Sequence, residues 1–202
     1  MTVPTVTPAW LAEVEARYRR KNKLLFTRDS LCLQPLLALI RQQSHRTLVV
    51  WAFDCVRGPL ETLAAHLPGE TRPQEAVRLC WQWAQGKLKM PPAKRALLEA
   101  HAVAKELSDP ADSALCHAVG QACASVHVET HAIGLPLYEL TALVLTHGLP
   151  QCAGPVEKKL AFYQQRLCHW QAHAGEQPGP WAPFLCTDAP NKEQRLYEKN
   201  HT

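Results

Sequence analysis

Apolar side chains recur every three or four residues along most of this chain, a spacing typical of amphipathic α-helices. No segment shows the strict alternation of apolar and polar positions that predicts a β-strand. Short connections that contain proline or glycine separate the helical stretches, as at Gly58 and Pro59 or at Gly148 and Pro150. The pattern therefore predicts an all-α fold, a single-domain helical bundle of about seven helices with a loose C-terminal tail.

The first expected helix has Thr7 as its N-cap, runs to about Phe26 and carries a basic segment from Arg17 to Lys23. Cations near the C-terminal end of a helix complement its dipole. We therefore interpret this segment as a solvated helix end, with nucleic-acid binding as the less favoured alternative. A second, short helix is expected after Asp29 or Ser30.

A strongly apolar run from Leu48 to Phe53 follows Ser44, which is a good N-cap residue. Because this run is apolar almost all round, it predicts a central, buried helix, and Gly58 with Pro59 should kink or end that helix. Asp54 lies at the end of the run. A carboxylate in such a place is costly unless it is paired, so we expect it to have a partner.

The remaining pattern predicts further helices over 71–86, 91–107, 109–134, 137–146 and 155–170. The helix over 109–134 is rich in small residues, and Gly134 with Pro136 should break it. Residues 1–43 are expected to form N-terminal helices, residues 44–173 the helical core, and residues 174–202 a Pro/Gly-rich tail. Within that tail, Trp181, Phe184 and Leu185 could dock on the body.

The 202 residues are 47% hydrophobic, which is ordinary for a globular protein, and their formal net charge is +4. Such a charge is too small to indicate nucleic-acid binding without a concentrated patch. No run has the length of a signal peptide core or a membrane span, so a cytoplasmic location is the default. The eight cysteines are expected to be reduced, since five of them fall within apolar helical patterns and none forms a Cys-x-x-Cys pair.

Histidines provide one candidate site. His127 and His131 are four residues apart, the spacing at which two imidazoles on a helix share one zinc ion. His101, Asp54 or Glu129 could supply a third ligand to a divalent metal such as zinc, although Glu129 points elsewhere on the same expected helix. No other cofactor is expected. The alternative, which we favour, is that these side chains are half-buried and satisfied by protein partners. Val128 follows His127 where zinc proteases have glutamate, so that class is unsupported.

Two other patterns have chemical or binding potential. Cys116 or Cys123 could be activated by His127 as a nucleophile, although free cysteines on packed helix faces are usually core residues. Two tryptophans of one expected helix lie about 200° apart around its axis, so at most one faces the core. Together with two nearby arginines they form a candidate partner surface, which consists of Trp81, Trp83, Arg72 and Arg78.

A series of short motifs resembles a family of small helical bacterial proteins regarded as immunity proteins of polymorphic-toxin systems. The matching pieces run in order from about Ser44 to Tyr138. They are His45-Arg46, Trp51-Ala52-x-Asp54-Cys55, Arg72-Pro73-x-x-Ala76, Trp83-Ala84-x-Gly86, Ala100-His101 and Ala118-x-Gly120-Gln121-Ala122-x-Ala124-Ser125-x-His127-Val128-x-x-His131-Ala132. The chain departs from the family at Lys105, where arginine is frequent, and at Gln121, where histidine is frequent.

The resemblance implies an all-helical cytosolic protein that binds and neutralises a cognate toxin. The mechanism would be occlusion, in which the bundle covers the toxin's own site without chemistry of its own. The alternative hypothesis is a metal-binding helical protein or a metal-dependent enzyme that uses His127, His131 and His101. No membrane partner is expected.

Overall fold

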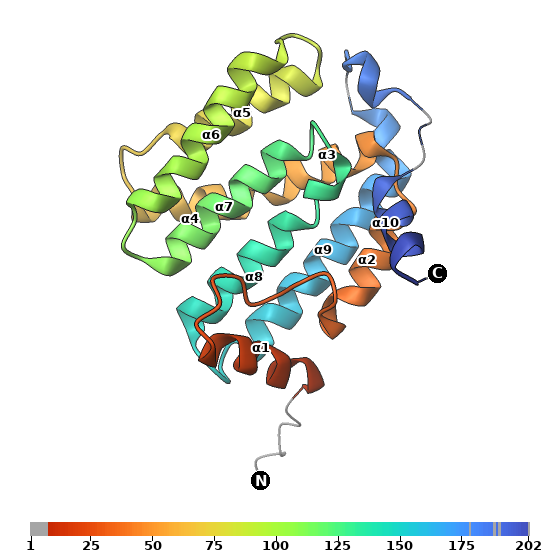
Figure 1. Ribbon diagram of the computed structural model, residues 1–202. Helices are drawn as coiled ribbons and strands as arrows, with labels where there is room; N and C mark the ends of the chain where they lie inside the picture. The colour runs from red at the N-terminus through yellow and green to blue at the C-terminus, as the bar shows by residue number, and fades with distance from the viewer. Residues whose placement is uncertain (1–7, 178, 188, 190, 202) are drawn as a thin grey trace.

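The computed structural model describes residues 8–177, 179–187, 189 and 191–201, and this part of the chain is helical without strands (Figure 1). None of its helices is long and apolar enough to cross a membrane. The α-helices outnumber the roughly seven expected from the sequence pattern. They are α1 (Ala9–Arg19), α2 (Gln34–Arg41), α3 (His45–Cys55), α4 (Arg57–His66), α5 (Arg72–Ala84), α6 (Met90–Glu106), α7 (Pro110–Ala124), α8 (Gly134–His147), α9 (Ala153–His173) and α10 (Lys192–His201).

Helix α7 is central to the packing, with α5, α6, α4 and α8 against it. Asp109 caps its N-terminus, because Oδ1 of this residue accepts hydrogen bonds from the backbone N–H groups of Ala111 and Asp112. The buried face of α7 carries small residues, among them Ala118 and Gly120. Small side chains let neighbouring helices approach closely, so α6 and α8 pack tightly on either side of α7.

Helix α3 is the buried helix that the apolar run predicts. Ser44 caps it by accepting a hydrogen bond from the Thr47 N–H, at 3.1 Å. Trp51 is fully buried, and its indole N–H donates to the Tyr163 carbonyl of α9 at 3.0 Å. The expected break after α3 is also present, with Gly58 and Pro59 in the first turn of α4.

The expected first helix is shorter than predicted. Helix α1 ends at Arg19, and Lys21 then has a left-handed backbone with φ of 56°. The following residues leave the helix and run across α8 (Figure 1), where the Leu25 N–H donates to Thr141 Oγ1 at 3.1 Å. Much of the basic segment is therefore a connection rather than a solvated helix end. The predicted N-cap, Thr7, lies outside the described residues.

The sequence pattern predicts one helix over 109–134. The second half of this prediction is wrong, because α7 ends at Ala124. Ser125 starts a turn in which its hydroxyl donates to the Ala122 carbonyl, and Val128 is extended. A short 3-10 turn, Glu129–His131, follows before α8 begins at Gly134. Gly134 and Pro136 therefore lie in the first turn of α8, where proline is tolerated.

The C-terminal tail packs on the body in its described residues and is not loose. The Ala182 N–H donates to the Ala84 carbonyl at 2.8 Å, and Leu185 is buried. Trp181 packs edge-on against Trp81, with ring centroids 5.6 Å apart. Farther along, Glu193 of α10 is buried and forms an ion pair with Arg28. The docking of the tail aromatics is thus confirmed.

We expect Trp181→Ala to lower the free energy of unfolding by about 2 kcal/mol. This loss is smaller than the loss expected when a fully buried tryptophan is replaced by alanine. The indole of Trp181 is partly buried against the core, and alanine would leave Trp81 without its edge-on neighbour. Urea unfolding followed by circular dichroism measures the change. Phe162→Ala on exposed α9 surface is the control, and an equal effect there would contradict a specific role for the tail.

Candidate functional site

Two histidines from neighbouring helices meet between α6 and α7. The Nδ1 atoms of His101 and His117 are 3.1 Å apart, so one ring donates a hydrogen bond to the other. This arrangement requires at least one ring to be neutral. The His117 ring also packs against Tyr138 of α8, with ring centroids 5.1 Å apart. Three helices thus converge on a half-buried pair of imidazoles.

Glycines make room for these side chains. A Cβ atom on Gly120 would lie 2.3 Å from His101 Cε1, and one on Gly134 would lie 2.4 Å from Gln121 Oε1. Both distances are far below van der Waals contact. Gly120 therefore permits the His101 ring to lie on α7, and Gly134 permits the Gln121 amide to lie against the start of α8.

Gln121 follows His117 by one turn of α7 and contacts the turn after this helix. Its Oε1 accepts a hydrogen bond from His131 Nδ1 at 2.9 Å. Burial lowers the pKa of His101, and electrostatic repulsion from His117 and then from His131 lowers it further. Four polar side chains therefore form one cluster across α6, α7 and the 3-10 turn after α7, which we call the histidine cluster: His101, His117, Gln121 and His131.

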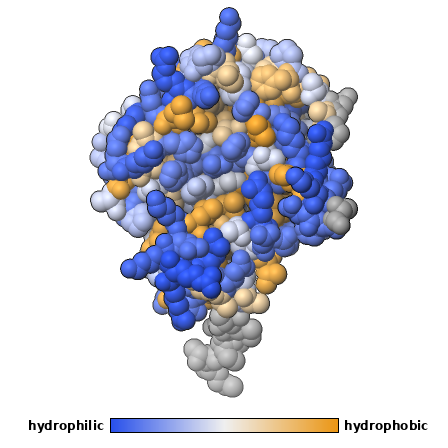
Figure 2. Space-filling view, viewed as in Figure 1, coloured by the Kyte–Doolittle hydropathy of each residue, from blue (hydrophilic) through white to orange (hydrophobic). Residues whose placement is uncertain are grey.

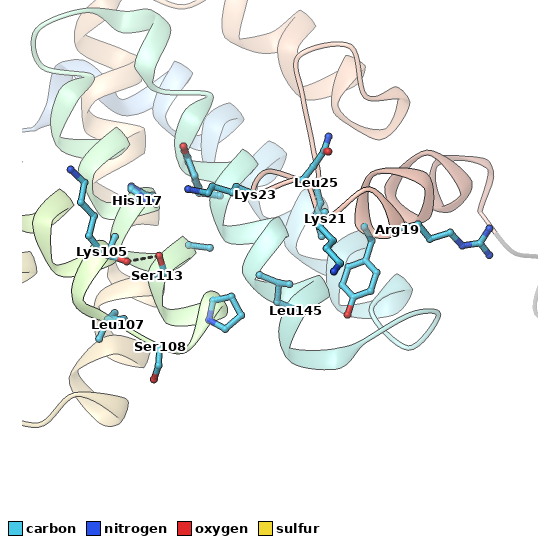
Figure 3. A pocket seen from close by; sticks show the side chains of 16 residues that line it. Arg19, Lys21, Lys23, Leu25, Lys105, Leu107, Ser108, Ser113, His117 and Leu145 are labelled. Atoms are coloured by element: carbon cyan, nitrogen blue, oxygen red, sulfur yellow. Dashed lines mark hydrogen bonds between the residues drawn. The ribbon is translucent and has the colours of Figure 1, made fainter.

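A pocket of about 920 Å³ opens beside the histidine cluster. It lies between the connection after α1, the end of α6, the start of α7 and the middle of α8 (Figure 3). Lys23 extends from the connection toward the helices that carry His117 and Lys105, as Figure 3 shows. We call this cavity the basic pocket. Its lining includes Tyr18, Arg19, Lys21, Lys23, Leu25, Lys105, Leu107, Ser113, His117, Tyr138 and Leu145.

Burial and nearby cations lower the pKa values of the histidines of this region. Burial lowers the pKa of His117 below its ordinary 6.5, and repulsion from Lys23 and Lys105 lowers it further. Burial likewise lowers the pKa of His101, with contributions from His117, His131 and Lys105. Both lysines therefore lie close enough to His117 to affect its charge, and the wall of the pocket is electropositive.

We expect Lys105→Gln to raise the pKa of His117 toward 6.5 without reaching it. The substitution removes one repelling charge, whereas the burial of the ring and the charge of Lys23 remain. An NMR titration of the imidazole protons measures the pKa. Lys94→Gln, on an exposed part of the same helix outside the pocket, should leave it unchanged. An unchanged His117 pKa in Lys105→Gln would contradict the proximity of the two groups.

Of the four residues of the predicted metal site, His101 and His131 belong to the histidine cluster, whereas His127 and Asp54 have other surroundings. Since α7 ends at Ala124, His127 and His131 do not share a helical face. His127 is exposed and stacks on Trp83 with ring centroids 6.2 Å apart. Asp54 has the partner that its position predicts: its Oδ2 accepts from Arg166 Nε at 2.5 Å and from Trp170 Nε1 at 2.9 Å. In the described part of the chain, no group of three or more His, Cys, Asp or Glu is arranged to hold a metal ion.

The residues of the predicted partner surface are engaged within the protein. Trp81 packs on Phe53 and Trp181, and Trp83 packs on His127 and Phe184. The guanidinium group of Arg72 bridges two carboxylates, at 2.6 Å from Glu70 and 2.5 Å from Glu106. Arg78 pairs with Glu75 on the same helix. The tail covers part of both tryptophan rings, so the surface available there is smaller than the sequence suggests.

Each of the eight cysteines is free, as expected. Burial raises the pKa of Cys116 to about 12. The pKa of Cys123 is also raised well above its ordinary value, by a hydrogen bond with Cys80 and by complete burial. A thiolate is thus strongly disfavoured at both positions, which removes the support for a nucleophilic role beside His127.

Sequence reasoning did not single out His117 or Tyr138, and the role of Lys23 and Lys105 beside them was also missed. One signal was available, because His117 and Gln121 lie four residues apart on the helix that carries Gly120. The convergence of the other side chains depends on how α6 and the connection after α1 fold back on α7 and α8.

Comparison with known proteins yields one match. The model of a family described as Imm-5 like putative immunity protein matches residues 38–167. This range contains the whole histidine cluster and Lys105, whereas Lys21 and Lys23 lie outside it. No curated protein and no solved structure matches the chain.

Proposed function

Because the chain belongs to the Imm-5 like family of immunity proteins, we propose that it binds a toxin protein and neutralises it in the cytoplasm of a bacterial cell. The observation that carries this proposal is the family match over residues 38–167, which spans α3 to α8 and much of α9. Those helices contain the histidine cluster and most of the hydrophobic core.

The proposed mechanism is occlusion without chemistry by this chain. The buried thiols have raised pKa values, and the histidines bind protein partners, so neither group favours a catalytic role. A helical body with a packed core can instead present a preformed surface, which limits the entropy lost when a partner binds. Binding over a toxin's active site would exclude that toxin's substrate.

Growth protection tests this function. Each reading frame that flanks the gene is expressed from an inducible promoter, alone and together with this chain. We expect one of them to stop growth alone and to permit growth in the presence of the chain. The purified pair should then form a complex of defined stoichiometry in size-exclusion chromatography with light scattering. Toxicity that the chain does not relieve, for every flanking frame, would contradict the proposal.

A further inference from the structure

The basic pocket carries cations for which the described residues provide no counter-charge. Lys21 and Lys23 come from the connection after α1, and Lys105 comes from the end of α6. In the part of the chain that the structure describes, no ion pair or hydrogen bond engages these three ammonium groups. No aspartate or glutamate is among the described residues that line the pocket. The pocket therefore has an uncompensated positive potential, which attracts anions.

Three acidic side chains near these lysines in the sequence have partners of their own. Glu106 follows Lys105 directly, but its carboxylate pairs with Arg72 at 2.5 Å. Glu15 pairs with Arg19 at 2.5 Å, and Asp109 caps α7. These contacts keep the carboxylates away from the lysines. An external anion would thus meet no competing carboxylate from the described residues that line the pocket.

The backbone that carries Lys21 and Lys23 is held in place on both sides. The Arg17 guanidinium donates two hydrogen bonds to the Leu24 carbonyl, at 3.1 and 3.2 Å, and so closes the turn around Lys21. Beyond it, Leu25 is buried and bound to Thr141 of α8. Because the segment is fixed before any ligand binds, less ordering of the backbone opposes binding.

The lining favours a short peptide segment over nucleic acid. Apolar side chains and rings, such as Leu107, Leu145 and Tyr138, line the pocket together with the lysines. In Figure 2, apolar atoms at the centre of this face are bordered by hydrophilic ones. Nucleic acid needs a basic groove that follows the backbone over several nucleotides. Arg17 and Arg19, which could extend such a groove, bind acceptors of this protein.

Tyr18 adds a feature typical of protein interfaces. Its side chain lines the pocket and is 46% exposed, and tyrosine is enriched among the residues that dominate binding energy. A partner that places carboxylates on Lys23 and Lys105 would also cover this ring. The rim thus combines charged and aromatic anchors on one side of the molecule.

We propose that the basic pocket receives an acidic segment of the toxin, whose carboxylates pair with Lys23 and Lys105. This inference rests on the proposed function and identifies the surface that performs it. The acidic segment would fill the hollow, while flanking parts of the toxin contact Tyr18 and the adjacent helices. Electrostatic attraction would also accelerate association at low ionic strength.

Two double charge reversals test the pocket. Lys23→Glu with Lys105→Glu changes the pocket, and Lys94→Glu with Arg95→Glu changes an exposed part of α6 outside it. Each pair of reversals lowers the formal net charge by the same amount, from +4 to zero. The probe is a fluorescein-labelled peptide that alternates glutamate with serine, and a glutamine version is the neutral control. Fluorescence anisotropy measures binding at low ionic strength.

We expect the wild type and the control variant to bind the acidic peptide with similar affinity, and the pocket variant to bind at least about tenfold more weakly. Equal loss in both variants, no loss in the pocket variant, or no binding by the wild type would overturn the inference. Tighter, pocket-dependent binding of a labelled single-stranded DNA of similar length would overturn it in favour of nucleic acid. Circular dichroism checks that both variants remain folded.

The growth-protection assay distinguishes failure of this inference from failure of the proposed function. A wild type that protects against a flanking toxin, with protection lost in the pocket variant and kept in the control variant, supports both. Protection that survives in the pocket variant overturns the inference and leaves the proposed function standing. Failure of the wild type to protect against every flanking toxin contradicts the proposed function, while the peptide measurement still decides whether the pocket binds acidic segments.

Discussion

Replacement of Gly120 by alanine is expected to lower the free energy of unfolding by about 3 kcal/mol. The added Cβ would lie 2.3 Å from Cε1 and 2.5 Å from Nε2 of His101. The ring cannot move without losing its hydrogen bond to His117 or displacing α6 from α7. A methyl group at this position therefore disturbs the contact between two central helices. Chemical denaturation followed by circular dichroism measures the loss.

Two further variants identify the cause of this loss. Gly154→Ala on α9 is the matched control, because nothing lies within 4 Å of its added Cβ. It should leave stability unchanged or raise it slightly, since alanine favours the helix over glycine. Combining Gly120→Ala with His101→Ala removes the ring that the methyl group meets, and should recover much of the stability. If Gly120→Ala alone were as stable as the wild type, the proposed clash would be absent.

Much of the fold can be predicted from helix periodicity and capping residues. Ser44 and Asp109 both accept the backbone hydrogen bonds that their positions predict, and the apolar run before Asp54 forms a buried helix. The end of α7 at Ala124 could not be predicted in this way, because no glycine or proline marks it. There, the Ser125 carbonyl accepts a hydrogen bond from His45 Nε2 at 2.7 Å. His45 lies 80 residues away from Ser125 in sequence, so their contact can be identified only from the folded structure.

The candidate site was harder to predict than the fold. Periodicity predicts a helix over 91–107 that carries His101, but not that His101 meets His117. Their contact depends on the register between α6 and α7, which the small residues around Gly120 determine. The approach of Lys23 depends on the early end of α1 at Arg19, because a longer helix would have carried this lysine away from α7. Long-range packing, rather than local pattern, therefore creates the basic pocket.

Glu139→Ala is expected to lower the free energy of unfolding by about 3 kcal/mol, because it removes the buried carboxylate that binds both Tyr163 and the partly exposed Lys159. Glu139 is 5% exposed, and its Oε1 lies 2.8 Å from Lys159 Nζ. Its other oxygen accepts a hydrogen bond from the buried Tyr163 hydroxyl. Alanine would leave an ammonium and a phenol without their acceptor between α8 and α9. Urea unfolding measures the change, and Glu157→Ala on the exposed face of α9 is the control.

Replacing Glu139, Lys159 and Tyr163 together distinguishes the loss of stability caused by an uncompensated charge from the loss caused by weaker packing. Glu139→Leu combined with Lys159→Met and Tyr163→Phe removes the charges and the hydroxyl together, and should be much closer to wild-type stability than Glu139→Ala. Equal instability of the triple variant would contradict this explanation. Tyr138 precedes Glu139 but faces His117 and the basic pocket, whereas Glu139 faces α9. A triple variant that stays folded should therefore keep its affinity for the acidic peptide, because Glu139, Lys159 and Tyr163 are not among the residues that line the basic pocket.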